Sequence, residues 1–258
     1  MKKITPAAIL RARALEALKA TWPTALAGSA LINLASYVLN QVLGVIPVIG
    51  ALFSILVMAL LTVPMIGLIK GVLGYYRGKP LTLDSVKAMF PHWQKVCMLY
   101  LWTMLCLVGW ILVGVAVAGG GWLGSMLLNG DGAPIKFFYL MGCFFVLAGN
   151  ILMLVLAFRA ALDYSMSNCI LIDDPSTGAR DALKKSKEMI HGYRWHYVKV
   201  SLPVFIILFA VVFVIGALTA ALPAWLASLI SSVMAIFTSM FSYYFVPVMY
   251  EELKRIGR

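Results

Sequence analysis

The stretch SLPVFIILFAVVFVIGAL, from Ser201 to Leu218, contains no ionisable side chain. It directly follows HGYRWHYVKV, from His191 to Val200, which holds Arg194, Lys199 and several aromatic residues. A helix that crosses the ~30 Å hydrocarbon core of a bilayer needs about 20 mostly apolar residues. The stretch therefore predicts a membrane-spanning helix over Val198–Ala221, entered through a charged and aromatic threshold.

The composition of the whole chain agrees with a membrane protein. Apolar residues make up 62% of it and charged residues 12%, whereas a soluble domain is about half apolar and about a quarter charged. Five more stretches have the length and composition of a span: Trp22–Leu43, Ile46–Gly74, Val96–Ala118, Phe137–Ala161 and Trp225–Tyr250. We expect an all-α, polytopic protein with six transmembrane helices in a single integral membrane domain over residues 1–258.

The basic residues predict how the chain is oriented. All of the 21 Lys and Arg residues except Lys136 fall in the N-terminal segment, in the loops after the second and fourth spans, or at the C-terminus. Cytoplasmic loops carry an excess of Lys and Arg, so both termini are expected on the cytoplasmic side. The net charge of +11 then reflects topology and attraction to anionic headgroups, and we expect no nucleic-acid partner.

One pattern occurs three times along the chain. Trp22, Trp93 and Trp195 each stand at the cytoplasmic threshold of a span, with a cation nearby and a short helical stretch before them. Together with Arg194 and Lys199 they are predicted to form interfacial elbows. The repeats define hairpin units over residues 5–80, 81–172 and 173–258, related by a pseudo-threefold axis along the membrane normal. The alternative is that Trp and Lys mark the inner thresholds of any six-span protein.

The short stretch before Trp195 is the clearest of the three. Its apolar face consists of Ala179, Ala182, Leu183, Ser186, Met189 and Ile190. Its charged face consists of Arg180, Asp181, Lys184, Lys185, Lys187 and Glu188. Gly192 suits the position after the helix end. We expect this helix to lie in the headgroup plane with its apolar face toward the lipid.

The segment from Phe158 to Leu202 resembles the signature of bacterial membrane proteins that share domain of unknown function 975, DUF975. The matching positions are Tyr164, Ser165, Met166, Asp174, Pro175, Ala182, Leu183, Ser186, Gly192 and Trp195. The segment Arg11–Trp22 is similar to the opening motif of that family, with Ala20-Thr21 where the family usually has Gly-Asn. The resemblance implies six spans in the bacterial cytoplasmic membrane. It also suggests a distant similarity to the membrane domain of glycerophosphodiester phosphodiesterases, without their catalytic barrel.

Ionisable side chains at the ends of spans are the candidates for a ligand site, because an Arg, Lys or Asp at a helix centre costs at least about 2.5 kcal/mol. We predict a cytoplasm-facing cluster that receives an anionic headgroup or a small anionic solute: Lys70, Tyr75, Tyr76, Arg159, Asp163 and Tyr164. Arg159 and Asp163 are four residues apart on one helical face and can pair. The alternative is that these charged side chains simply snorkel to the surface.

Three smaller motifs carry structural predictions. Gly67 and Gly71 form a G-x-x-x-G pattern, and Gly216 with Ala220 forms a similar small pair, both typical of close helix packing inside one chain. Asp173-Asp174 before Pro175 predicts a turn and a helix start. The four Cys residues share no metal-type spacing and are predicted to be structural thiols: Cys97, Cys106, Cys143 and Cys169.

The chain has no Gly-rich phosphate loop, no H-E-x-x-H and no G-x-S-x-G motif, so we expect no catalytic residue, no metal ligand and no cofactor. The expected function is that of a non-catalytic membrane protein that binds lipid, chiefly anionic, or a partner protein, as an accessory or envelope-homeostasis component. The alternative is a transporter for a small solute or lipid. A transporter requires a polar cavity that reaches mid-membrane, whereas an accessory protein requires a packed apolar core with an apolar outer groove.

Overall fold

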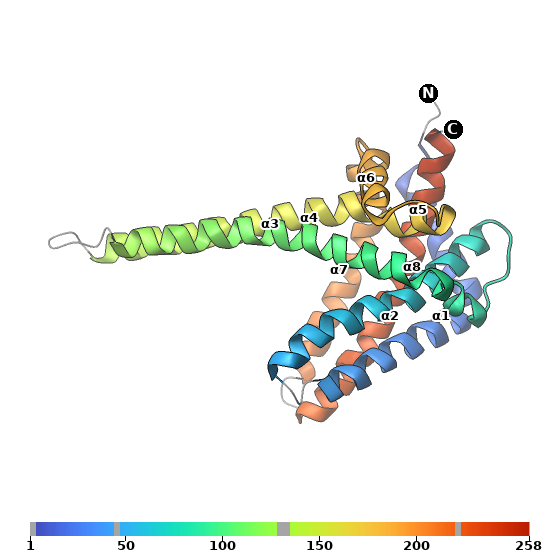
Figure 1. Ribbon diagram of the computed structural model, residues 1–258, viewed down its shortest axis with the longest axis horizontal. Helices are drawn as coiled ribbons and strands as arrows, with labels where there is room; N and C mark the ends of the chain where they lie inside the picture. The colour runs from blue at the N-terminus through green and yellow to red at the C-terminus, as the bar shows by residue number, and fades with distance from the viewer. Residues whose placement is uncertain (1–3, 44–46, 128–134, 220–222, 258) are drawn as a thin grey trace. The chain divides into compact units, whose positions relative to one another are not determined.

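The fold is known from a computed structural model, which describes residues 4–43, 47–127, 135–219 and 223–257 (Figure 1). Nearly all of these residues are helical and none lies in a strand, which confirms the all-α prediction. The elements are α1 (Ala7–Leu43), α2 (Pro47–Tyr76), the 3₁₀ turns η1 (Leu83–Lys87) and η2 (Phe90–His92), α3 (Trp93–Leu127), α4 (Ile135–Tyr164), α5 (Ser167–Asp173), α6 (Ala179–Ile190), α7 (Arg194–Thr219) and α8 (Ala224–Gly257).

Five segments of the described chain are long and apolar enough to cross a membrane. They are Ile55–Tyr76, Leu83–Leu123, Leu140–Asp173, Arg194–Ala217 and Ile230–Gly257, and they contain most of the second to sixth predicted spans. The first predicted span lies on α1, which is not among them. Polar residues such as Ser29, Asn33 and Ser36 lower the hydropathy of this helix.

The chain divides into two compact units, the first made of Met1–Tyr100 with Met166–Arg258 and the second of Leu101–Ser165. In the first unit α1 packs against α2, α7 and α8, and α7 also packs against α8. The first and third predicted hairpins are therefore each in contact along their two long helices. The pseudo-threefold arrangement of three hairpins stays a prediction.

Polar side chains join α1 to α8 inside the first unit. The hydroxyls of Thr21 and Tyr244 are hydrogen-bonded at 2.5 Å. The Asn33 side-chain amide donates to the Ser29 carbonyl at 2.8 Å and to the Ser239 hydroxyl at 3.2 Å. A polar group in hydrocarbon must find its partner within the protein, so these bonds favour a position of α1 among other helices. Of the long helices α1 is the least hydrophobic, and it packs against α2, α7 and α8.

The second unit is built on close contact between α3 and α4. A Cβ atom added at Gly149 of α4 would lie 2.7 Å from Ala118 Cβ of α3, and one added at Gly114 of α3 would lie 2.4 Å from Met153 Cβ of α4. Away from this contact both helices expose large apolar side chains, with Leu112 60% and Leu154 65% exposed. A soluble protein does not leave so much contiguous apolar surface in water, whereas lipid tails cover it without cost.

The first two predicted elbows are wrong in their local structure. No separate short helix precedes Trp22, because α1 continues through Trp22 and Pro23. A proline inside a membrane helix is tolerated where neighbouring groups compensate for the lost hydrogen bond. Before Trp93 the chain forms the 3₁₀ turns η1 and η2 rather than an amphipathic helix.

The third predicted unit has the expected helix but a different neighbour. α6 ends at Ile190, Gly192 has φ +85°, and α7 begins at Arg194, as predicted. However, the apolar face of α6 packs against α5 and is buried by protein. The Ser186 hydroxyl on this face accepts a hydrogen bond from the Met166 backbone N–H at 3.1 Å. The expected contact of this face with lipid is therefore wrong.

Gly67 and Gly71 serve internal packing, as predicted, but against η1. A Cβ atom at Gly67 would lie 2.4 Å from the Val86 carbonyl oxygen, and one at Gly71 would lie 2.7 Å from Ser85 Cβ. Gly216 of the second small pair has open space beside it, and Ala220 lies outside the described residues.

We predict that Gly67→Ala destabilises the first unit by about 1–3 kcal/mol, because the added methyl group meets backbone that cannot move without displacing η1. The matched control is Gly74→Ala on the same helix, where the nearest atom to an added Cβ is Lys79 Cβ at 3.7 Å. Thermal unfolding in a mild detergent measures both variants. Equal unfolding temperatures would contradict the close approach of α2 and η1.

Candidate functional site

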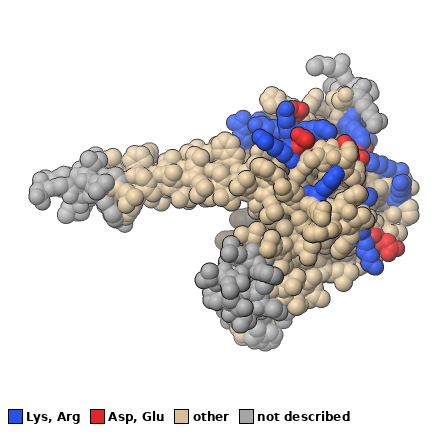
Figure 2. Space-filling view, in the orientation of Figure 1, with Lys and Arg blue, Asp and Glu red and all other residues tan. Residues whose placement is uncertain are grey.

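The charged side chains lie near the ends of the long helices. No Asp, Glu, Lys or Arg occurs between Ala20 and Ile69 or between Ser201 and Tyr250. Figure 2 shows Lys and Arg side chains, with Asp and Glu among them, gathered around α6 and the carboxyl end of α8. This end of the first unit is the region with the chemical groups to select a ligand.

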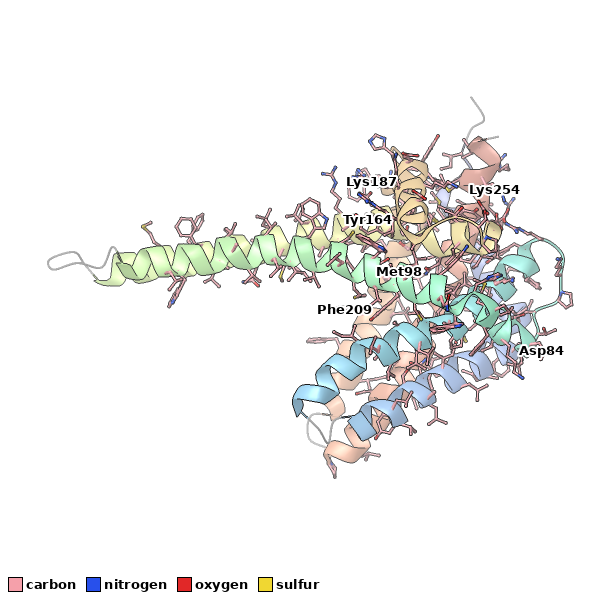
Figure 3. All side chains as sticks on the ribbon, viewed as in Figure 1. Asp84, Met98, Tyr164, Lys187, Phe209 and Lys254 are labelled. Carbon is pink, nitrogen blue, oxygen red and sulfur yellow. The ribbon has the colours of Figure 1, made fainter. Side chains whose placement is uncertain are left out.

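Asp173, at the carboxyl end of α5, is the centre of an ion-pair network there. Arg77 at the end of α2 donates to its two carboxylate oxygens at 2.7 and 3.0 Å. Tyr250 of α8 donates to it at 2.9 Å, and Lys254 of α8 also donates to it (Figure 3). The Nε atom of Arg77 donates to Glu251 at 2.7 Å. The network therefore ties together the carboxyl ends of α2, α5 and α8, which are far apart in sequence.

The network fixes the charge of Arg77. The hydrogen bonds with Asp173 raise the pKa of Arg77, partial burial lowers it, and the bond with Glu251 raises it again. The net effect is a pKa above the ordinary value, so the guanidinium stays charged at every physiological pH. Its fork geometry matches a carboxylate bidentately, which a lysine in this position does not reproduce.

Asp174, the next residue, forms the predicted turn rather than a ligand site. Its carboxylate accepts the Ser176 backbone N–H at 3.1 Å and the Thr177 hydroxyl at 2.6 Å. Side-chain hydrogen bonds from Ser176 and Thr177 lower the pKa of Asp174 to about 2. The turn leads into α6 two residues after Thr177. Among the described residues no three His, Cys, Asp or Glu side chains come together as a metal site.

Beside the network lies a hollow of about 820 Å³, which we call the basic hollow. Its walls come from α1, the end of α2 and the last turns of α8. Its charged lining consists of Arg13, Arg77, Glu251, Glu252, Lys254 and Arg255. A second hollow of about 700 Å³ shares Arg13 and Tyr76 with it and continues past Tyr75 and Lys79.

Residues 4–219 match the protein family described as Protein of unknown function (DUF975). The chain belongs to the DUF975 family. The match covers most of the chain and includes both segments whose motifs suggested this family. No curated protein and no solved structure matches the chain. The resemblance to the membrane domain of glycerophosphodiester phosphodiesterases is not supported by these comparisons.

Two of the predicted site residues of this DUF975 protein lie beside the hollows. The rings of Tyr75 and Tyr76 pack edge to face with centroids 6.3 Å apart, and the Tyr76 hydroxyl donates to the Tyr244 carbonyl at 3.4 Å. Lys70 instead donates to the Ala88 carbonyl at 3.3 Å, next to η1. It therefore supports a loop and does not line either hollow.

The other three predicted residues belong to the second unit. Arg159 is exposed and Asp163 is buried. Tyr164 is half-buried. The structure describes each unit by itself, so a single cluster of all six residues stays a prediction.

The predicted elbow tryptophans have the exposure that a membrane interface requires. Trp22 is 54%, Trp93 47% and Trp195 72% exposed. Lys199 is exposed and Arg194 is half-buried. Their amphipathic rings and cations suit the headgroup layer even where the backbone has no elbow.

Sequence reasoning missed Asp173 and Arg13 as members of a site. Asp173 was assigned to the turn that Asp174 alone forms. The available signal was a cluster of charged residues at the end of an apolar run: Glu251, Glu252, Lys254 and Arg255. Buried carboxylates near the end of a helix need cationic partners.

We predict that Asp173→Asn lowers the free energy of unfolding by about 1–3 kcal/mol, because two cations lose a charged acceptor in a partly buried position. Asp84→Asn is the matched control, since Asp84 is exposed and has no ion pair among the described residues. Thermal unfolding of both variants in the same detergent measures the difference. A loss no larger than that of the control would show that the network does not hold the three helices together.

Proposed function

We propose that this DUF975 protein is a non-catalytic integral protein of the bacterial cytoplasmic membrane, with six spans and both termini inside. In this proposal it binds membrane lipid, chiefly anionic, or a partner protein, and acts as an accessory or envelope-homeostasis component. The observation that carries the proposal is the contrast between the apolar surfaces of the long helices and the charged end of the first unit. Phe209 of α7 is 71% exposed and lies in a helix with no charge beyond Lys199 (Figure 3).

The proposal of six spans requires α1 to cross the membrane as well as the five segments identified by hydropathy. The polar residue Ser29 of α1 is buried and Asn33 is half-buried and bonded to Ser239 of α8, while Leu31, Leu34 and Val38 are exposed. The side chains that α1 presents outward are therefore apolar, whatever its mean hydropathy. Such a helix is suited to cross the bilayer beside other helices, although it is not suited to cross alone.

The hollows within the spans favour an accessory role. A groove of about 520 Å³ between α7 and α8 is lined chiefly by apolar residues, including Phe205, Phe209 and Met234. The larger hollows with charged linings all lie at the charged end of the first unit. One of them, of about 880 Å³, lies between α6 and α8, and Met189, Leu253 and other apolar residues line it inside a charged rim. An apolar centre with a polar rim is the usual composition of a protein–protein interface.

One observation favours the transporter alternative. The Ser29 hydroxyl is fully buried in the first unit and has no hydrogen-bond partner among the described residues. A polar group of this kind at depth is what a solute path would use. The apolar lining of the described grooves in the spans argues against such a path.

The orientation is tested by cysteine labelling in intact cells, in a variant whose four native cysteines are replaced by alanine. Cysteine at Ile4 or at Gly257 should react with a membrane-permeant maleimide and not with an impermeant one. Cysteine at Asp131, in the predicted outer connection, should react with both. If α1 does not span, the two ends lie on opposite sides, and one of them becomes accessible to the impermeant reagent.

The two candidate functions are separated by Ser29→Cys in the same cysteine-free background. An accessory protein with a packed core leaves this thiol unreactive toward a small water-soluble thiosulfonate, because no water reaches it. Rapid modification, at a rate comparable to that of an exposed cysteine at Gly257, would instead support a water-filled path and the transporter alternative.

A further inference from the structure

Among the described residues, one cation that lines the basic hollow is not neutralised by an ion pair. Arg77 pairs with Asp173 and Glu251, Lys254 pairs with Asp173, and Arg255 pairs with Glu252. The exposed guanidinium of Arg13 has no ion pair and no hydrogen bond within the described part of the chain.

The carboxylates of the hollow are committed to other partners. Glu251 accepts from Arg77. Glu252 is 4% exposed and accepts from Arg255 at 2.6 Å and from the Thr5 backbone N–H at 2.8 Å. Turning either carboxylate toward Arg13 would leave these buried or charged donors without an acceptor, which costs more than a surface ion pair returns. Among the charges that line the basic hollow, the unpaired positive charge is therefore that of Arg13. Glu16, three residues along α1, lines the adjoining hollow and makes no ion pair with Arg13 among the described residues.

We infer that Arg13 and the basic hollow bind a phosphate group. This inference rests on the proposed function and assigns its anionic ligand to a site other than the cluster predicted from the sequence. A guanidinium binds phosphate through two parallel N–H donors, and it does so at lower desolvation cost than an ammonium. Tyr75, whose hydroxyl has no protein partner among the described residues, lies on the adjoining wall as a further donor.

The position of Arg13 leaves two sources for the phosphate. Arg13 precedes the threshold residue Trp22 by nine positions on a continuous helix, which is a rise of about 13 Å. A long arginine side chain at this height reaches the outer part of the headgroup layer. Ala17 and Ala20 continue the wall of the adjoining hollow toward the membrane with small side chains. The phosphate belongs either to an inner-leaflet phospholipid or to a phosphorylated solute.

The test compares two substitutions in the full-length protein purified in a mild detergent. Arg13→Gln removes the proposed ligand. Arg11→Gln is the matched control, because it makes the same change in net charge on α1 at a half-buried residue that lines neither hollow. Arg13→Lys keeps the charge and loses the bidentate geometry. Size-exclusion profiles and unfolding temperatures verify that each variant is folded.

The lipid arm measures, by native mass spectrometry, binding of added phosphatidylglycerol relative to phosphatidylcholine. The solute arm measures the rise in unfolding temperature with inorganic phosphate in delipidated protein. In at least one arm, Arg13→Gln should lower the apparent affinity for the added lipid or phosphate about tenfold, which is the effect of losing a hydrogen bond to a charged group. Arg13→Lys should fall between it and the wild type, and Arg11→Gln should match the wild type. A response in the first arm identifies a headgroup, and a response confined to the second identifies a solute.

The outcomes also separate this inference from the proposed function. A preference for phosphatidylglycerol that is equal in the wild type and in Arg13→Gln, together with equal responses of the two proteins to inorganic phosphate, overturns the site at Arg13 but leaves lipid binding intact. Equal effects of Arg13→Gln and Arg11→Gln overturn it as well, because they indicate a non-specific effect of net charge. A wild-type protein that responds in neither arm and copurifies with neither lipid nor a second protein overturns the proposed function itself.

Discussion

The structure of the first unit depends on one constraint, which is that a polar atom in hydrocarbon must be paired within the protein. α1 contains the polar side chains that an isolated spanning helix avoids, and it is the helix that packs against α2, α7 and α8. Its bonds from Thr21 to Tyr244 and from Asn33 to Ser239 bring α1 and α8 together although their residues are more than 200 positions apart. The remaining surface of α1 is then apolar and can face lipid.

The same constraint acts at the charged end in another form. Asp173 and Glu252 are largely withdrawn from solvent, and each has cationic or backbone donors around it. Both sets of bonds involve the last turns of α8, one toward α2 and α5 and one toward the start of the chain. The carboxyl end of α8 thus holds the charged end of the unit together, as the bonds from Tyr244 and Ser239 hold its middle to α1.

The sequence predicted the elements formed by local patterns. Long apolar runs located the long helices, and the spacing of Ala182, Ser186 and Ile190 located the buried face of α6. It did not predict what covers that face, because an amphipathic pattern is the same for lipid and for α5. It also placed an elbow at Trp22, since a charged stretch followed by Trp-Pro is compatible with either a break or a continuous helix. Asp173 was missed because its partners come from residues 77 and 254, and periodicity contains no information on contacts at that separation.

The distribution of polar groups also limits where ligand selectivity can arise. Side chains that line the described grooves within the spans are mostly apolar, so those grooves distinguish ligands by shape alone. At the charged end, by contrast, almost every ionic group lining the basic hollow is held by a partner, and a held charge neither moves toward a ligand nor attracts one strongly. An arginine without a partner at the edge of such a set has its full charge available, in surroundings already rigid from the bonds among its neighbours. In the proposed phosphate site, selectivity for an anion would therefore arise from the pairing of the surrounding charges as much as from the arginine itself.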